Sequence, residues 1–202
     1  MKNKLFLAMS LCICIVSSYL YVHAQEVSTE DMLDRCMNIG QEFLNDYYYT
    51  IEMKQDLDMS KYSIKDEVGQ YIKLKNKIMK EVSEKKYGEI AYTFTTVSCY
   101  NYRFLDDGIE IIFNVSVRNK CSGSDEVNES LQQVRLGFNY YKDSIVINDY
   151  FEYTDFDKYI NYLQAKEADS DKEKYNNRLI FTDELIAIVE KVYNTVYKKV
   201  IL

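Results

Sequence analysis

The feature that most constrains the fold is a change of hydrophobic period near Tyr87. Before this residue, apolar side chains recur every three or four positions, as on one face of an α-helix; after it, they recur at every second position, as on one face of a β-strand. The second region is also rich in β-branched and aromatic residues, which favour strands. The sequence therefore predicts an α+β domain in which helices precede an antiparallel sheet and pack on it.

Two amphipathic helices are expected before the change of period. Ser28 and Ser63 are residue types typical of a helix N-cap, with Asp31 and Asp66 three positions later. Lys75 falls on the apolar face of the second helix, where its methylene stem can extend along the other side chains. The apolar faces comprise Met32, Cys36, Met37, Gly40, Phe43, Leu44, Tyr47, Tyr48 and Ile51, and then Val68, Tyr71, Ile72, Ile78, Met79 and Val82.

The first two strands form the clearest hairpin. A two-residue turn at Asp107-Gly108 pairs residue 106 with residue 109. This register places both apolar sets on one face of the sheet, together with Cys121, and points Cys99 to the other face. A bridge between those two cysteines therefore fails, and Cys36 with Cys121 is the better pair if a disulfide forms. The apolar sets are Ile90, Tyr92, Phe94, Tyr100, Tyr102 and Phe104, and then Ile109, Ile111, Phe113, Val115 and Val117.

Two more alternating runs complete a curved four-stranded meander. A polar loop over residues 122–129 leads to the third strand, and a turn at Lys142-Asp143 leads to the fourth. We expect the two helices to cover one face of this sheet. The alternating residues are Val134, Leu136, Phe138 and Tyr140, followed by Ile145, Ile147, Asp149, Phe151 and Tyr153.

Three segments follow the sheet. Apolar residues between Phe156 and Leu163 predict a short helix. Residues 165–178 are mostly charged or small and are interpreted as an acidic linker, the alternative being the solvated surface of a helix. The helix predicted over 179–202 has an apolar stripe that either packs on the domain, which we favour, or forms the surface of a homodimer. The stripe is Leu185, Ile188, Val189, Val192, Tyr193, Val196, Tyr197 and Val200.

The N-terminus has the organisation of a secretion signal over residues 1–24. Lys2 and Lys4 precede an apolar run, and Val22-His23-Ala24 is a cleavage site of the small-x-small type. The run also approaches the length of a membrane span, so an uncleaved membrane anchor is the alternative. Either way, the main domain over residues 25–164 is expected outside the cytoplasm.

The composition excludes several classes of function. The only histidine, His23, lies in the signal, so the mature chain has no imidazole for a catalytic relay or a histidine-ligated metal. The formal net charge of −7 disfavours nucleic acid as a partner. Tyrosine is abundant, but most tyrosines fall at positions where the hydrophobic period predicts burial in the core. Tyr47-Tyr48-Tyr49 is interpreted as core residues plus one exposed ring. We expect no metal and no cofactor.

Four segments resemble the nuclear transport factor 2-like domain of secreted bacterial proteins, the kind also found ahead of putative amidase domains. They are Phe43-Leu44-Asn45-Asp46-Tyr47-Tyr48, Tyr71-Ile72-Lys73-Leu74-Lys75, Ile145-Val146-Ile147-Asn148-Asp149-Tyr150 and Asp155-Phe156-Asp157-Lys158-Tyr159. The resemblance covers roughly residues 29–163. It implies a cone, in which a strongly curved sheet wraps against helices and leaves a pocket at its open end. Ile145 stands where many such domains have tryptophan, and no amidase domain follows residue 163, so amidase activity is not carried over.

The resemblance also gives the candidate site. The superfamily includes isomerases and dehydratases with an acidic base and tyrosines inside the cone, and Asp149 falls on the apolar phase of the last strand, in reach of Tyr102 or Tyr140. A buried carboxylate beside phenols can act as a base. The favoured interpretation is nevertheless a structural carboxylate in a secreted or surface-associated, non-catalytic module that binds a small molecule or an extracellular protein. A small lyase or isomerase using Asp149 is the alternative.

Overall fold

The computed structural model describes residues 29–141, 144–168 and 176–198. The predicted signal over 1–24, the cap at Ser28 and the turn at Lys142-Asp143 lie outside the described residues. The chain divides into two compact units, Met1–Asn38 and Ile39–Leu202. The first unit contributes the helical residues 29–38, and the second contains the sheet and the other helices.

Both predicted N-terminal helices are present. Helical residues run over 29–52, and α2 covers Asp66–Tyr87. Asn76 of α2 donates to the carbonyl oxygen of Tyr47 at 3.3 Å and to Thr50 Oγ1 at 3.1 Å, which joins α2 to residues 39–52 side by side. Of the three consecutive tyrosines, Tyr47 and Tyr48 are buried and Tyr49 is 43% exposed, as predicted.

The start of α2 differs from the prediction. Its N-cap residue is Lys65, which has no side-chain capping bond, and Ser63 does not cap the helix. Instead, the backbone at residues 63–65 runs beside the last strand: Ile147 N donates to Ser63 O, and Lys65 N donates to Ile147 O, both at 2.9 Å. This segment therefore covers part of one edge of the sheet.

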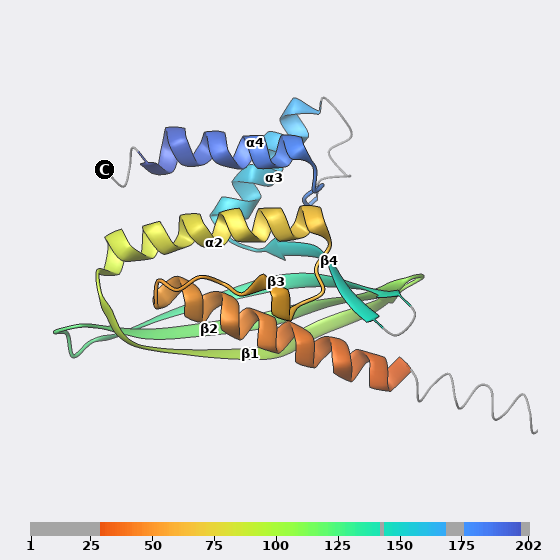
Figure 1. The fold of residues 1–202 in the computed structure, drawn as a ribbon, viewed down its shortest axis with the longest axis horizontal. Coiled ribbons are helices and arrows are strands. Elements are labelled where there is room, and N and C mark those ends of the chain that lie inside the picture. Colours follow the sequence, from red (N-terminus) through yellow and green to blue (C-terminus); the bar gives the residue numbers. More distant parts are fainter. Residues whose placement is uncertain (1–28, 142–143, 169–175, 199–202) are drawn as a thin grey trace, which may run out of the picture. The chain divides into compact units, whose positions relative to one another are not determined.

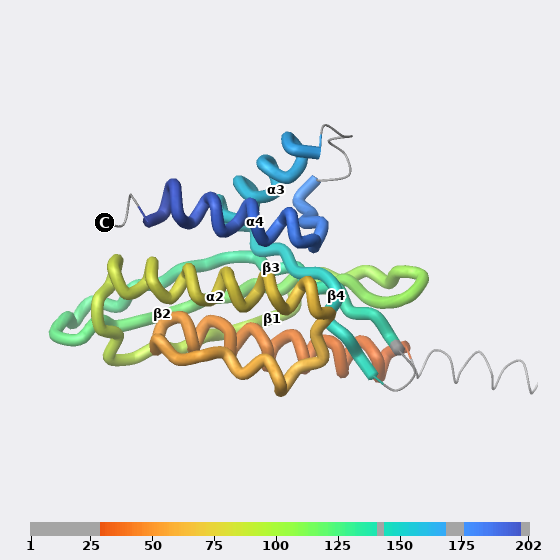
Figure 2. The backbone as a smooth tube through the Cα atoms, turned by 45° about the horizontal axis from the view of Figure 1, so that its top comes forward, coloured from red at the N-terminus to blue at the C-terminus, as the bar shows by residue number. Residues whose placement is uncertain are grey.

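The four strands form the predicted antiparallel meander, and the fold belongs to the α+β class. They are β1 (Ile90–Leu105), β2 (Gly108–Cys121), β3 (Val127–Tyr141) and β4 (Ser144–Glu152), in the spatial order β1-β2-β3-β4. Figures 1 and 2 show the long strands β1 to β3 side by side and the shorter β4 at the end next to α2 and α3. The edges of the sheet are therefore β1 and β4.

One face of the sheet, here the inner face, carries the core. Gly40 lies so close to the rings of Phe113 and Phe138 that a Cβ there would clash with Phe113, so residues 39–52 pack directly on β2 and β3. The opposite, outer face is the one that carries Glu110 and Asn114. The fully or almost fully buried residues of the inner face are Ile109, Ile111, Phe113, Val115, Val117, Val134, Leu136, Phe138, Ile147 and Tyr150.

The predicted register of the first hairpin is wrong. Leu105 pairs with Gly108, so the turn consists of Asp106-Asp107. An irregularity between Cys99 and Asn101 also inserts Tyr100 as an extra residue in β1. A bulge of this kind exchanges the two faces of a strand. Cys99 therefore lies opposite Phe113 on the inner face, not on the outer face as predicted.

A second bulge changes the phase of β4. Phe138 pairs with Ile147 and Gly137 pairs with Asp149, so Asn148 is the extra residue. Partners across antiparallel strands have their side chains on one face. Asp149 therefore lies on the outer face with the Gly137 position, and the prediction that it shares the apolar phase of Ile147 is wrong.

The segments after the sheet pack on α2. They are α3 (Asp155–Glu167), α4 (Asp183–Val192) and a π-helical continuation, η3 (Tyr193–Tyr197). The Thr182 side chain caps α4 by accepting from Leu185 N. Residues 165–167 belong to α3, so the predicted linker begins later than expected, and its residues 169–175 lie outside the described part. The α4 side chains Leu185, Ile188, Val189 and Val192 are buried, in agreement with packing within the chain.

Candidate functional site

The three predicted site residues are not brought together. Tyr102 pairs with Ile111, which is an inner-face residue. Tyr140 pairs with Ile145, and this pair lies two residues along from the inner-face pair of Phe138 and Ile147. Both tyrosines therefore lie on the inner face of the sheet. Asp149 lies on the outer face. Its neighbours are Arg135 and Arg178, so the structure offers no constellation of Asp149 with these two phenols.

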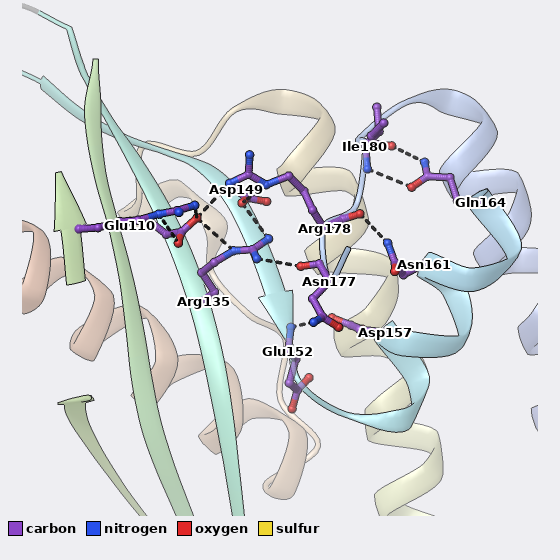
Figure 3. A network of polar contacts seen from close by, with 11 residues as sticks. Glu110, Arg135, Asp149, Glu152, Asp157, Asn161, Gln164, Asn177, Arg178 and Ile180 are labelled. Carbon is purple, nitrogen blue, oxygen red and sulfur yellow. Dashed lines mark hydrogen bonds and ion pairs between the residues drawn. The ribbon is translucent and has the colours of Figure 1, made fainter. Parts of the chain in front are cut away.

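Asp149 belongs instead to an arginine network on the outer face, formed by Arg103, Arg135 and Arg178 with Glu110 and Asp149 (Figure 3 shows all but Arg103 with labels). Arg135 Nη2 lies 3.0 Å from Asp149 Oδ2, and Arg178 Nη2 lies 2.9 Å from Glu110 Oε2. Arg103 Nε lies 2.9 Å from Glu110 Oε1. Three guanidinium groups face two carboxylates, which leaves one positive charge in excess.

The arginine network fastens the segment before α4 to the sheet. Arg135 Nη1 donates to Asn177 O at 2.7 Å, and Asn161 of α3 donates to Arg178 O at 2.6 Å. Gln164 of α3 both donates to Ile180 O and accepts from Ile180 N, at 2.5 and 3.0 Å. Residues 177–180 thus lie between α3 and the outer face of the sheet (Figure 3). We interpret this network as structural, since its carboxylates are engaged by arginines.

A second ionic group, the lysine cluster, is buried on the inner side of β4. Lys75 Nζ lies 2.5 Å from both Glu152 Oε2 and Asp157 Oδ1. Tyr71 donates to Asp157 and Tyr48 donates to Glu152, each at 2.6 Å. The Asp157 carboxylate also accepts from Glu152 N at 2.8 Å. The side chains of Lys75 and Asp157 are fully buried. The sequence predicts only that the methylene stem of Lys75 lies along the apolar face, whereas its ammonium group is buried as well.

In the lysine cluster, burial and the attraction between opposite charges shift the pKa values in opposite directions. Burial raises the pKa of Asp157 above its ordinary value; Lys75 opposes this shift and Glu152 adds to it. For Lys75, burial alone lowers the pKa, but the two carboxylates reverse that effect and the resulting pKa is raised. Burial also raises the pKa of Tyr71 well above its usual range. Such a cluster joins α2, β4 and α3, and its central ammonium group is closed to substrates.

Sequence reasoning missed both ionic groups. One signal was available: a lysine on the apolar face of a helix needs a buried partner when its head cannot reach water. The partners Glu152 and Asp157 could not be identified, because they lie on β4 and α3, far along the chain.

The outer face also has a hollow beside the arginine network, because its lining residue Gln133 lies two positions from Arg135 on β3. Its volume is about 590 Å³, and no charged side chain lines it. Cross-strand pairing arranges the lining side chains in two rows, Thr96–Ser116–Leu131 and Ser98–Asn114–Gln133, with Tyr153 beyond Gln133.

The described cysteines form no disulfide: Cys36, Cys99 and Cys121 are thiols. Cys36 is buried, and Cys121 is half-buried at the end of β2. The pairing of Cys36 with Cys121 is therefore absent from this structure and stays a prediction. Among the described residues, no group of three or more cysteine or acidic side chains is placed to hold a metal ion.

Comparisons with known proteins identify no relative: no family model, no curated protein and no solved structure matches this chain. The nuclear transport factor 2-like resemblance therefore stays a prediction. No helix in the described ranges combines the length and apolar character needed to cross a membrane.

Proposed function

We propose that the protein is a secreted or surface-associated, non-catalytic binding module that holds a neutral, hydroxyl-rich ligand, such as an oligosaccharide, in the outer-face hollow. The observation that carries this proposal is the chemistry of the lining. More than a quarter of the chain is charged, yet the hollow is lined only by hydroxyl, amide, aliphatic and phenol side chains. Neutral donors and acceptors suit a ligand that is polar but uncharged.

The hollow also has apolar surfaces suited to a sugar ring. Leu131 is 76% exposed in the hollow, and Phe94, on the next row of β1, is 53% exposed. Tyr153 lines the opposite end. Aromatic and aliphatic side chains of this kind present flat apolar area beside polar groups. A sugar ring has the matching combination of C–H face and hydroxyl edge.

The charges next to the hollow are paired with each other. Arg118 Nε lies 3.1 Å from Glu129 Oε1, and Ser116 donates to the same oxygen at 2.9 Å. Within the hollow, Gln133 donates to Asn114 Oδ1 at 3.0 Å, which fixes both amides. By contrast, Thr96 and Ser98 have no side-chain hydrogen-bond partner among the described residues, so their hydroxyls can bind a ligand.

The enzyme alternative lacks comparable support, because Asp149 is engaged by two arginines and lies apart from Tyr102 and Tyr140. Secretion and surface association rest on the predicted signal. The alternative location, an uncleaved membrane anchor, would leave the hollow and its chemistry unchanged.

The proposal is tested by titrating the purified, isotope-labelled protein with cellohexaose, chitohexaose and maltohexaose while recording amide chemical shifts. At least one sugar should shift amides in residues 96–98, 114–116 and 131–133. The isosteric variant Asn114→Asp should weaken this binding about tenfold, because it places a charge against a neutral ligand. Gln70→Glu, on the α2 surface in a different hollow, is the matched control and should bind like the wild type.

Two results would contradict the proposal. One is the absence of outer-face shifts with all three sugars. The other is an equal loss of affinity in Asn114→Asp and Gln70→Glu, which would place the ligand elsewhere.

A further inference from the structure

Strand β1 forms one of the two edges of the sheet. The other edge of the sheet, β4, is partly covered by the bridge between Ile64 and Ile147. In the part of the chain that the structure describes, β1 pairs with β2 alone, over almost its whole length from Ile90 to Leu105. A long unpaired edge presents backbone donors and acceptors that can bind another strand.

This edge lacks most of the features that usually prevent pairing. From Ile90 to Tyr102 the strand contains no charged residue and no proline. Two irregularities, at Ala91 and at Tyr100, are the protective devices present, and the stretch between them pairs regularly with β2. Tyr92, Phe94 and Tyr100 are 55%, 53% and 62% exposed, so the edge is flanked by aromatic side chains in contact with water.

The direction of the free backbone groups can be assigned. Val97 O accepts a hydrogen bond from Gln41 Nε2 at 3.5 Å, so this carbonyl points away from β2. In an antiparallel ladder, the N–H and C=O of one residue point to the same side, and alternate residues share that side. Thr93, Thr95 and Val97 therefore offer their backbone groups to the edge. The Gln41 contact lies at the distance limit and is easily exchanged for a strand partner.

We propose that the occupant of this edge is a second copy of the chain, paired antiparallel through β1 about a two-fold axis at Thr96. This arrangement places Thr95 of each copy opposite Val97 of the other, which joins their outward-facing backbone groups. It also places Tyr92 opposite Tyr100, an aromatic pair of the kind that stabilises antiparallel strands. The two four-stranded sheets become one continuous sheet.

The charges at the two ends of β1 favour a copy over an unrelated strand. Arg103 is the one charged residue of β1, and Glu89 immediately precedes the strand. The same two-fold pairing sets Glu89 of each copy opposite Arg103 of the other. Both side chains are exposed, and Arg103 would contact this Glu89 in addition to Glu110 of its own chain. Elsewhere, two copies with a net charge of −7 repel each other. The neutral strand with opposite charges at its ends is therefore complementary to itself, as a two-fold interface requires.

The first experiment is cross-linking by cysteine. Two Thr96→Cys chains would face each other across the axis at a separation that a disulfide can bridge. In a Cys99→Ser background, Thr96→Cys should yield a covalent dimer on mild oxidation. Asn114→Cys, in the same background, is the matched control: this exposed position on the outer face of β2 lies one strand away from the edge and should stay monomeric.

The second experiment is a charge exchange read by light scattering. The wild type should have twice the mass of the chain, Arg103→Glu should weaken the dimer by about tenfold in Kd, and Arg103→Glu combined with Glu89→Arg should restore it. Arg118→Glu, a comparably exposed arginine on β2, is the control and should remain dimeric.

A monomeric wild type at high concentration overturns the proposal. So does a dimer that Thr95→Pro leaves intact, since proline removes the outward N–H of residue 95. Circular dichroism establishes whether each variant is folded, and the double charge exchange needs no change to the backbone. Thr96 lies both on the proposed axis and in the hollow, so the sugar titration uses Asn114→Asp and Gln70→Glu, which leave β1 unchanged, and either proposal can fail without the other.

Discussion

Two ionic networks lie on opposite faces of β4, only three residues apart in the chain, and they are built differently. Glu152 points to the inner side and Asp149 to the outer face, because the bulge at Asn148 sets the phase of the strand. The inner network has one cation, Lys75, for two carboxylates. The outer network has three arginines for two carboxylates. The first therefore has an excess of negative charge and the second an excess of positive charge.

The difference follows from access to water. At the outer face, Arg103 and Arg178 are 61% and 46% exposed, so solvent screens the extra charge. In the lysine cluster, Lys75 has no exposure, and the protein itself must supply every stabilising contact. The Tyr48 and Tyr71 hydroxyls supply them by donating to the carboxylates. The buried network should therefore be the more sensitive of the two to the loss of one partner.

The largest expected effect is that of Lys75→Met. This change leaves two carboxylates buried without their cation, and we expect the free energy of unfolding to fall by about 3–5 kcal/mol. Arg135→Met is the matched change in the outer network. There Arg178 still contacts both Glu110 and Asp149, so the expected loss is smaller, about 1–3 kcal/mol. Urea denaturation of both variants measures the difference.

A further variant identifies the cause of the loss at Lys75. Adding Asp157→Asn to Lys75→Met removes one unpaired buried charge and should recover part of the lost stability. Equal losses in Lys75→Met and Arg135→Met, or no recovery in the double variant, would show that packing rather than charge determines the cost.

The separation of the two networks can be tested at Gly137. A Cβ at this position would lie 2.7 Å from both Asp149 Cβ and Asn148 Oδ1, so the bulge requires glycine opposite it. We expect Gly137→Ala to lower the free energy of unfolding by about 1–3 kcal/mol and to displace Asp149 from Arg135. Chemical shifts of the Arg135 guanidinium report the displacement.

Gly69→Ala is the matched control for this change. Gly69 lies in α2, and the nearest atoms to an added Cβ are 3.8 Å away. Alanine should stabilise the helix there by about 0.5–1 kcal/mol. If Gly137→Ala were as well tolerated as Gly69→Ala, the bulge would not depend on glycine.

The same glycine shows where sequence reasoning reached its limit. The two helices, the meander and the buried stripe of α4 could be predicted, since each depends on local periodicity. The bulges at Tyr100 and Asn148 could not, because each is defined by the partner strand and leaves the alternation of the sequence intact. Asp149 was consequently assigned to the wrong face. Lys75 was placed correctly on its helix, but its partners depend on how α3 and β4 pack against α2.

The smallest expected effect is the pH dependence that the lysine cluster gives to the free energy of unfolding. Its sign is opposite to the sign expected for a carboxylate on the outer face. Burial raises the pKa of Asp157 in the folded state, so the folded protein binds this proton more readily than the unfolded chain. The stability contribution therefore increases as the pH falls from above the raised pKa to below the ordinary one. Relative to Asp157→Asn, the wild type should gain free energy of unfolding as the pH is lowered from neutral toward the ordinary carboxyl range near pH 4, at no more than about 1.4 kcal/mol per pH unit. Glu129 on the outer face is the comparison, because hydrogen bonds from Ser116 and Arg118 lower its pKa. Its contribution to stability is therefore lost as the pH falls through the lowered value. Relative to Glu129→Gln, the wild type should lose free energy of unfolding on acidification. Urea titrations of the three proteins across this range measure both trends, and a wild type that loses stability relative to Asp157→Asn on acidification would show that Lys75 and Tyr71 outweigh the burial of Asp157.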